Sequence, residues 1–338
     1  INFFHLALET LKRDVRTGYL IYAYDELQSL RAQVSIPSKV DIFGESSRCK
    51  DINLDISYRA PKEILTTAHA IGLGVYRKVD DSSETPLVNF VDETTLLDMG
   101  YKNIGQDFKA GNHIVLERTK ENNTEIEIDA PIYVSDMAKQ NSVVAEEIIR
   151  LLLEEDVKPS DIMLIDMDGN NLTRNYNQFS LIFDALLYNT ELNKNVHIKL
   201  VSGKTPSMTK SENSIIYTTV FRAKGNEANL VYLINCNKIQ TSNRNSTYRN
   251  EIFTAMTRAK VKVWLYGGTV DFLKEEIEAT RDHDYKLEFI YPTEQQKESI
   301  RIMGDSDEKL ENNIIAAQEL PIEILEQLLK QKLGSKND

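Results

Sequence analysis

The feature that most constrains this chain is the regular alternation of strand-length apolar runs with amphipathic helical segments between Ser142 and Gly267. Runs rich in Val, Ile and Leu suit strands that are buried on both faces, as in a parallel sheet covered by helices. We therefore predict an α/β fold built on a parallel sheet with helices on both faces. We expect its strands within 161–166, 198–202, 215–220, 230–235 and 262–267, and its helices within 142–155, 179–188 and 253–258.

The sequence on either side of this region does not continue this regular alternation. An amphipathic helical segment precedes an apolar run at 19–24, and a further helix is predicted to begin at Pro61 and to end near Tyr76. Glycines and polar runs interrupt short β-prone pieces at about 80–130, which predicts a small β-rich insert. Residues 271–338 contain 17 acidic and 9 basic side chains and are predicted to form an acidic, mostly helical segment. We place the domains at 1–50, 51–270 and 271–338.

Composition narrows the class of protein. A chain of 338 residues with 41% hydrophobic content can bury a sizeable core. Since no apolar stretch approaches the roughly 20 residues that cross a bilayer, we predict a cytoplasmic protein without a membrane partner. The two cysteines and five histidines are scattered, so no metal site is predicted. The net charge of −12 disfavours nucleic acid, but 199–224 and 244–262 each hold five basic residues against one acidic residue.

The segment 219–227, TVFRAKGNE, precedes the apolar run at 230–235. A strand that ends in a turn around Lys224 and Gly225 exposes backbone amides at a sheet edge, where α/β folds bind ligands. Its Ala-Lys-Gly-x-Glu sequence at 223–227 resembles motif V of superfamily 1 DNA helicases of the UvrD/Rep type.

The segment 248–259, YRNEIFTAMTRA, precedes the apolar run at 262–267. Helical spacing places Arg249 and Arg258 at the two ends of an amphipathic helix, and a guanidinium with its permanent charge suits a transferring phosphate. The segment resembles motif VI of the same family, which ends in Thr-Arg-Ala. The two motifs occur here in the family's order.

Two earlier segments match further motifs of that family. The Tyr58-Arg59 pair resembles motif IV, although Ser57 stands where the family usually has Asn. Asp25 and Gln28 follow the apolar run at 19–24 and resemble motif III. The sequence DELQ at 25–28 can also be read as a Walker B motif whose carboxylates hold magnesium. The number of residues between this segment and Arg59 favours motif III.

The resemblance implies that the chain contains the end of one RecA-like domain and the whole of a second. In this family ATP binds between the two, which predicts catalytic roles at the γ-phosphate for Arg59, Arg258 and Gln28. By family position, we also expect ATP contacts from Asp25, Gly225 and Glu227, and nucleic-acid contacts from Thr219, Phe221, Lys224 and Arg249.

The phosphate-binding side of the ATP site is not recognisable. The SGKT sequence at 202–205 lacks the first glycine of a Walker A loop, because Ile198 holds that place. We therefore expect the phosphate loop and the magnesium carboxylates in a missing N-terminal RecA-like domain. ATP and Mg²⁺ are predicted cofactors of the full-length protein, and the isolated chain is expected to bind neither stably and to hydrolyse ATP no faster than background.

The predicted function is that of the C-terminal half of an ATP-dependent helicase or translocase, with single-stranded or duplex DNA, or RNA, and other subunits as partners. The short insert leaves no room for the large helical subdomain of UvrD, which argues against processive unwinding and leaves translocation or remodelling as the expected activity. One alternative is a degenerate helicase-like binding module without ATPase activity. Another is an unrelated α/β nucleotide enzyme whose motif matches are accidental.

Overall fold

The computed structural model describes residues 26–28, 30, 56–79, 84–118, 132–136, 139–188, 190–192, 195–203, 211–239, 246–267 and 271–302. The chain divides into two compact units. One consists of 1–26, 33–51 and 302–338. The other consists of 27–32 and 52–301, contains nearly all the described residues, and is the unit described below. The helix and strand predicted within 3–24 lie outside the described residues.

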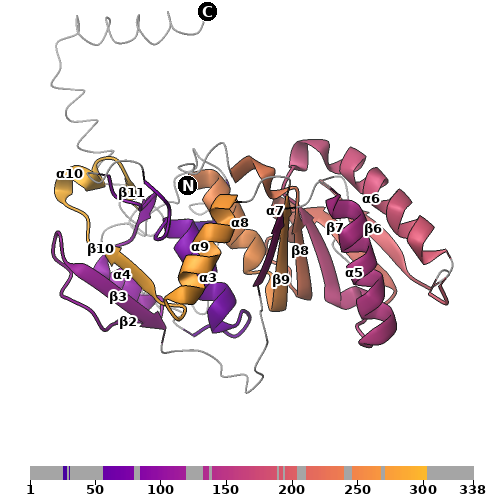
Figure 1. Ribbon diagram of the computed structural model, residues 1–338, viewed down its shortest axis with the longest axis horizontal. Coiled ribbons are helices and arrows are strands. Elements are labelled where there is room, and N and C mark those ends of the chain that lie inside the picture. Colours follow the sequence, from indigo (N-terminus) through magenta and orange to yellow (C-terminus); the bar gives the residue numbers. More distant parts are fainter. Residues whose placement is uncertain are drawn as a thin grey trace, which may run out of the picture. The chain divides into compact units, whose positions relative to one another are not determined.

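The largest sheet among the described residues has six strands, and Figure 1 shows several of them side by side. Every pair of neighbouring strands is parallel, which confirms the predicted parallel sheet. Five of the strands match the predicted ones, and the sixth, β4, was not foreseen. The strand order is β4 (Ile132–Asp136), β9 (Ala259–Gly267), β8 (Ala228–Ile234), β5 (Ile162–Asp166), β7 (Ser214–Thr219) and β6 (His197–Val201).

Helices cover both faces of the sheet. On one face, α5 (Gln140–Glu154) and α6 (Leu172–Leu187) bury a continuous apolar cluster against alternate residues of the strands, including Ile162 and Leu164 of β5. Because side chains alternate along a strand, Met163 and Ile165 face the opposite side. There α8 (Ser246–Met256) contacts β8 and β9, and α3 (Lys62–Leu73) packs on α8. The predicted α/β fold is confirmed and is consistent with a RecA-like domain.

A smaller antiparallel sheet contains β2 (Tyr101–Asn103), β3 (His113–Arg118) and β10 (Leu287–Ile290), with β3 in the centre. The insert is therefore β-rich, as predicted. The strand β10 lies in the segment 271–338, which was predicted to be mostly helical, and the pattern did not show this strand. This strand buries Leu287 and Phe289 on one face and pairs with β3 along its whole length, so tertiary packing outweighs the charged composition around it.

The remaining elements are short or connect the two sheets. The helix α9 (Asp271–Asp282) agrees with the predicted helical character of its segment and packs on α3. Residues 303–338 of that segment lie outside the described residues. The other elements are η1 (Glu26–Gln28), β1 (Asn89–Phe90), α4 (Glu93–Asp98), η2 (Pro159–Asp161), η3 (Gly169–Asn171), α7 (Val220–Ala223), η4 (Cys236–Ile239), α10 (Glu294–Lys297) and β11 (Arg301–Ile302).

A buried imidazole lies where α3 meets the small sheet. His69 Nδ1 is 2.8 Å from the hydroxyl of Tyr101, and the His69 ring stacks on Phe253 with the centroids 5.2 Å apart. Burial, with a smaller contribution from the positive charge of Arg118, lowers the pKa of His69 to about 3. The side chain is therefore neutral in the folded chain near neutral pH.

We expect this histidine to make the chain less stable as the pH falls. Between the unfolded-state pKa of about 6.5 and the folded-state pKa of about 3, only the unfolded chain takes up the proton. Its contribution to the free energy of unfolding should therefore fall by up to about 1.4 kcal/mol for each pH unit below 6.5. Urea unfolding at several pH values should show a shallower dependence for His69→Gln than for His197→Gln, which changes an exposed histidine. Equal slopes for the two variants would contradict the assignment.

Candidate functional site

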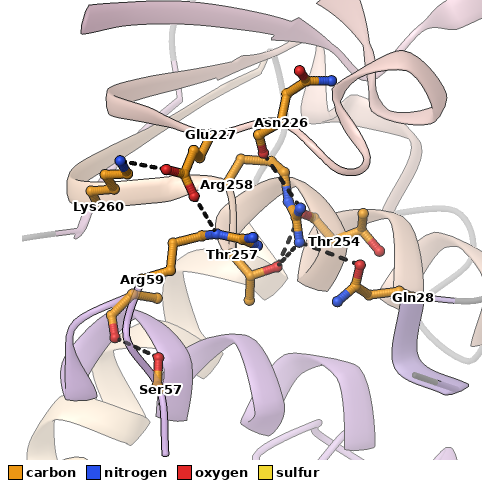
Figure 2. Close-up of polar contacts among 10 residues, drawn as sticks. Gln28, Ser57, Arg59, Asn226, Glu227, Thr254, Thr257, Arg258 and Lys260 are labelled. Carbon is orange, nitrogen blue, oxygen red and sulfur yellow. Dashed lines mark hydrogen bonds and ion pairs between the residues drawn. The ribbon is translucent and has the colours of Figure 1, made fainter. Parts of the chain in front are cut away.

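Several of the predicted nucleotide-binding residues meet at one edge of the large sheet (Figure 2). Glu227 immediately precedes β8, and Arg258 immediately precedes β9. The two strands are parallel neighbours, and Ala228 pairs with Ala259, so both side chains start from the amino ends of adjacent strands. Arg59 approaches from the turn before α3, and Gln28 from η1.

The Arg258 guanidinium is held by uncharged acceptors. Its Nε donates to the carbonyl of Thr254 at 2.8 Å, one turn back in α8. Its two terminal nitrogens donate to the carbonyl of Asn226 at 3.4 Å, the hydroxyl of Thr257 at 3.1 Å and Oε1 of Gln28 at 3.4 Å. The residue is 1% exposed. These bonds fix the plane of the guanidinium.

The Glu227 carboxylate lies between two cations. Its Oε2 accepts a hydrogen bond from Arg59 Nε at 2.8 Å, and its Oε1 forms an ion pair with Lys260. The hydrogen bond from Lys260 is the largest cause that lowers the pKa of Glu227, and Arg59 adds to it. The carboxylate is therefore ionised near neutral pH. All three side chains are more than a third exposed, so solvent and ligands can reach them.

An exposed aromatic residue adjoins this group. Tyr58 is 75% exposed and directly precedes Arg59. Its neighbour Ser57 donates from its hydroxyl to the carbonyl of Ala60 at 3.1 Å and closes the turn that leads into α3. The sequence prediction gave a role to Arg59 only. An aromatic side chain that folding leaves in solvent beside a predicted phosphate-binding residue is the signal for a stacking surface.

The predicted nucleic-acid contacts lie in different places. Thr219 ends β7, and Phe221 follows it in α7 with 51% of its surface exposed. Since β7 and β8 are parallel to the same strand, the carboxyl end of β7 and the amino end of β8 lie at opposite edges of the sheet. Thr219 and Phe221 are thus separated from Glu227 by the length of the strands. Motif V therefore extends from one edge to the other.

The turn between these edges explains one predicted residue. Gly225 has a φ of +85°, in the left-handed region that favours glycine, and a Cβ added there would meet no atom within 4 Å. Backbone conformation alone accounts for glycine at this position. The nearby Lys224 donates from Nζ to the carbonyl of Gln28 at 3.0 Å, which brings it to the amino edge with the arginines. Its predicted contact with nucleic acid stays a prediction.

The position of Arg249 does not fit the predicted contact with nucleic acid. The residue is 0% exposed. Its two terminal nitrogens form 2.8 Å bonds to both carboxylate oxygens of Glu276 in α9, and one of them also donates to the carbonyl of Ile71 in α3 at 2.6 Å. Helical spacing placed this arginine at one end of a helix, and it is the fourth residue of α8, but the spacing could not show that α3 and α9 cover that side. The guanidinium therefore joins three helices inside the unit.

A buried acid at the carboxyl edge escaped the sequence analysis. Asp166 ends β5 and accepts hydrogen bonds from Asn235 and Asn175 at 2.8 and 2.9 Å, from the backbone amide of Asp168 at 2.9 Å and from the hydroxyl of Tyr217 at 3.1 Å. Burial raises its pKa, and these four donors oppose that change. The network connects the ends of β5, β7 and β8. An aspartate at the end of an otherwise apolar strand was the available signal.

Two further expectations concern ligands and membranes. Asp25, a predicted ATP contact, lies outside the described residues. Among the residues that the structure describes, no group of three or more His, Cys, Asp or Glu side chains could hold a metal ion. No described helix has the length and apolar character needed to span a bilayer.

Comparison with known families connects this geometry to a class of protein. The family described as UvrD-like helicase C-terminal domain matches residues 214–266, which run from β7 to the end of β9. Residues 214–266 are therefore similar to the C-terminal domain of UvrD-like helicases. This UvrD-like segment includes Thr219, Glu227 and Arg258, whereas Gln28 and Arg59 come from outside it.

Comparisons with whole proteins do not extend this similarity. No curated protein matches the chain. Among solved structures, the chain is similar to the C-terminal domain of a possible DNA helicase from Lactobacillus plantarum WCFS1, with 15% identity and a TM-score of 0.32. That similarity covers 45% of this chain and 83% of the other.

Proposed function

We propose that this chain is the C-terminal part of an ATP-dependent superfamily 1 DNA helicase or translocase, and that its amino-edge cluster contributes arginines to an ATP site. The UvrD-like segment supports a helicase-type role with nucleic acid and other domains as partners in general. The observation that carries the proposal is that Arg59 and Lys260 share the Glu227 carboxylate at the same edge of the sheet where Arg258 lies.

The charge of this cluster favours a polyphosphate. Three cations and one carboxylate give these four side chains a net charge of +2 within a chain whose net charge is −12. Arginine donors in a fixed plane match phosphate oxygens, and Arg258 is already oriented by its neutral acceptors. In such a site we assign Arg59 and Arg258 to the charge that develops on the γ-phosphoryl group, with Gln28 beside them.

We also propose that the nucleic acid binds at the carboxyl edge of the sheet, opposite the nucleotide cluster. Phe221 presents an exposed ring at the carboxyl edge, and stacking on aromatic rings is a common way to bind bases without sequence preference. The segment 219–227 links that edge to Glu227. A movement of the nucleotide cluster could therefore be transmitted along this segment to the bound strand.

ATP and Mg²⁺ belong to the proposal as cofactors of a larger assembly. The cations of the amino edge fit the phosphates of ATP, but the described residues provide no group of magnesium ligands. We propose that a second RecA-like domain supplies the phosphate loop and the magnesium carboxylates, as the motif order predicts.

Single-stranded DNA is expected to stimulate ATP hydrolysis by a protein that joins this chain to such a domain. We also expect Phe221→Ala to weaken single-strand binding by about 1 to 3 kcal/mol, as loss of one stacked base contact does. Fluorescence anisotropy at several salt concentrations and a steady-state ATPase assay measure the two effects. Leu181→Ala, which removes an exposed apolar side chain from α6, is the matched control.

The outcomes separate the proposal from its alternative. Salt-dependent strand binding without any ATP hydrolysis would favour a helicase-like binding module. An unchanged affinity of Phe221→Ala for single-stranded DNA would contradict the proposal that the nucleic acid binds at the carboxyl edge of the sheet.

A further inference from the structure

Lys260 has no part in the predicted site, yet the structure places it inside the cluster. It is the second residue of β9 and forms an ion pair with Oε1 of Glu227, while Arg59 occupies Oε2 (Figure 2). The carboxylate is thus shared between a lysine on the sheet and an arginine on the turn before α3. The side chains of Arg59, Glu227 and Lys260 are 38%, 39% and 42% exposed, which is the setting in which ion pairs exchange partners readily.

This sharing matters when an anion arrives. If a phosphate recruits Arg59, the Glu227 carboxylate loses one of the cations that pair with it. An ionised carboxylate that stays close to phosphates without a counter-charge repels them. With Lys260 on its other oxygen, Glu227 remains neutralised after Arg59 has moved.

We propose that Lys260 is a positioning residue of the nucleotide site, which anchors Glu227 so that Arg59 can exchange from this carboxylate to a phosphate. The inference rests on the proposed nucleotide-binding function and adds a residue to it. Lys260 acts through Glu227, and its effect requires that carboxylate. A lysine that contacted the phosphate directly would act whether or not Glu227 was charged.

A double-mutant cycle in the ATPase-competent protein tests this dependence. We expect Lys260→Gln to raise the KM for ATP about three- to fivefold, the range of partly exposed ion pairs, with a smaller change in kcat. In the Glu227→Gln background, Lys260→Gln should change the KM for ATP very little. In the protein that keeps Glu227, Lys260→Arg should have a KM close to the wild-type value. Lys262→Gln removes the same charge from the same strand, at a lysine that lies over the Trp264 ring, and is the matched control. An equal effect of Lys260→Gln in both backgrounds would overturn the inference.

A second measurement does not depend on ATP. In a ¹³C NMR titration of this chain, Lys260→Gln should raise the pKa of the Glu227 carboxyl, because it removes the largest cause that lowers that pKa. Lys262→Gln should leave that pKa unchanged. An unchanged titration in Lys260→Gln refutes the anchoring role even if the protein hydrolyses ATP. If the titration gives the expected result but the protein binds no ATP, the proposed function and the nucleotide part of the inference are refuted. Only the ion pair between Lys260 and Glu227 would then be supported.

Discussion

Glu276→Ala is expected to lower the free energy of unfolding of this chain by about 3 to 5 kcal/mol, the usual cost of removing one partner from a buried ion pair. Glu276 is 2% exposed and accepts two 2.8 Å bonds from Arg249, which is fully buried. Without the carboxylate, the guanidinium loses both bonds to Glu276 and keeps the bond to the Ile71 carbonyl inside the helix packing. Urea denaturation followed by circular dichroism measures the loss.

The neighbouring residue provides the control. Glu275 lies on the same helix and pairs with Lys78 at 2.7 Å, but both side chains are exposed, so Glu275→Ala should cost less than about 1 kcal/mol. Replacing both buried partners, as in Arg249→Met with Glu276→Leu, should recover much of the stability because no uncompensated charge remains. If Glu276→Ala were no more harmful than Glu275→Ala, the ion pair would not have the structural importance that its burial indicates.

Arg258→Ala is expected to reduce ATP turnover by about 10³- to 10⁵-fold in a protein that contains this chain and the proposed partner domain, the range found for arginines that stabilise phosphoryl transfer. Nucleotide affinity should change only a few-fold, because the guanidinium acts on charge that develops during the reaction. Single-turnover hydrolysis and nucleotide-binding assays separate the two quantities.

Two further variants make this result interpretable. Arg258→Lys keeps the positive charge but loses the planar fork that reaches Thr254, Thr257 and Gln28, so turnover should stay low. Arg174→Ala removes an exposed arginine from α6 and should leave turnover unchanged. Because Arg258 is buried, circular dichroism must show that its variants remain folded. Turnover near the wild-type rate in folded Arg258→Ala would remove this residue from the proposed mechanism.

The large sheet was predictable from sequence because its strands are buried on both sides. Continuous apolar runs such as 162–166 and 230–234 leave few alternatives in a chain that alternates them with helices. The small sheet was harder to predict. The strand β10 is short and lies among charged residues, and it is stabilised by pairing with β3, a contact between segments that are distant in the sequence. Local patterns do not contain that information.

The candidate site was partly predictable, for a related reason. Motif positions identified Arg59, Glu227 and Arg258, and the structure brings all three to one edge of the sheet. Motif positions could not show that α3 and α9 cover Arg249, or that Lys260 shares the carboxylate of Glu227. Both facts depend on which elements pack together. Burial and ion pairing depend on the tertiary structure, whereas a sequence motif contains only the order of residue types.

The pairing of β10 with β3 also affects how the chain is made. The β2–β3 hairpin leaves the ribosome early, but its third strand follows only after the entire parallel sheet and α9 have been synthesised. Until then one edge of β3 has no partner, and exposed strand edges invite pairing with other chains. Translation that stops shortly after β9 would therefore release a chain with a complete large sheet and an open small one. Such a product should aggregate more readily than a chain that extends through Ile290.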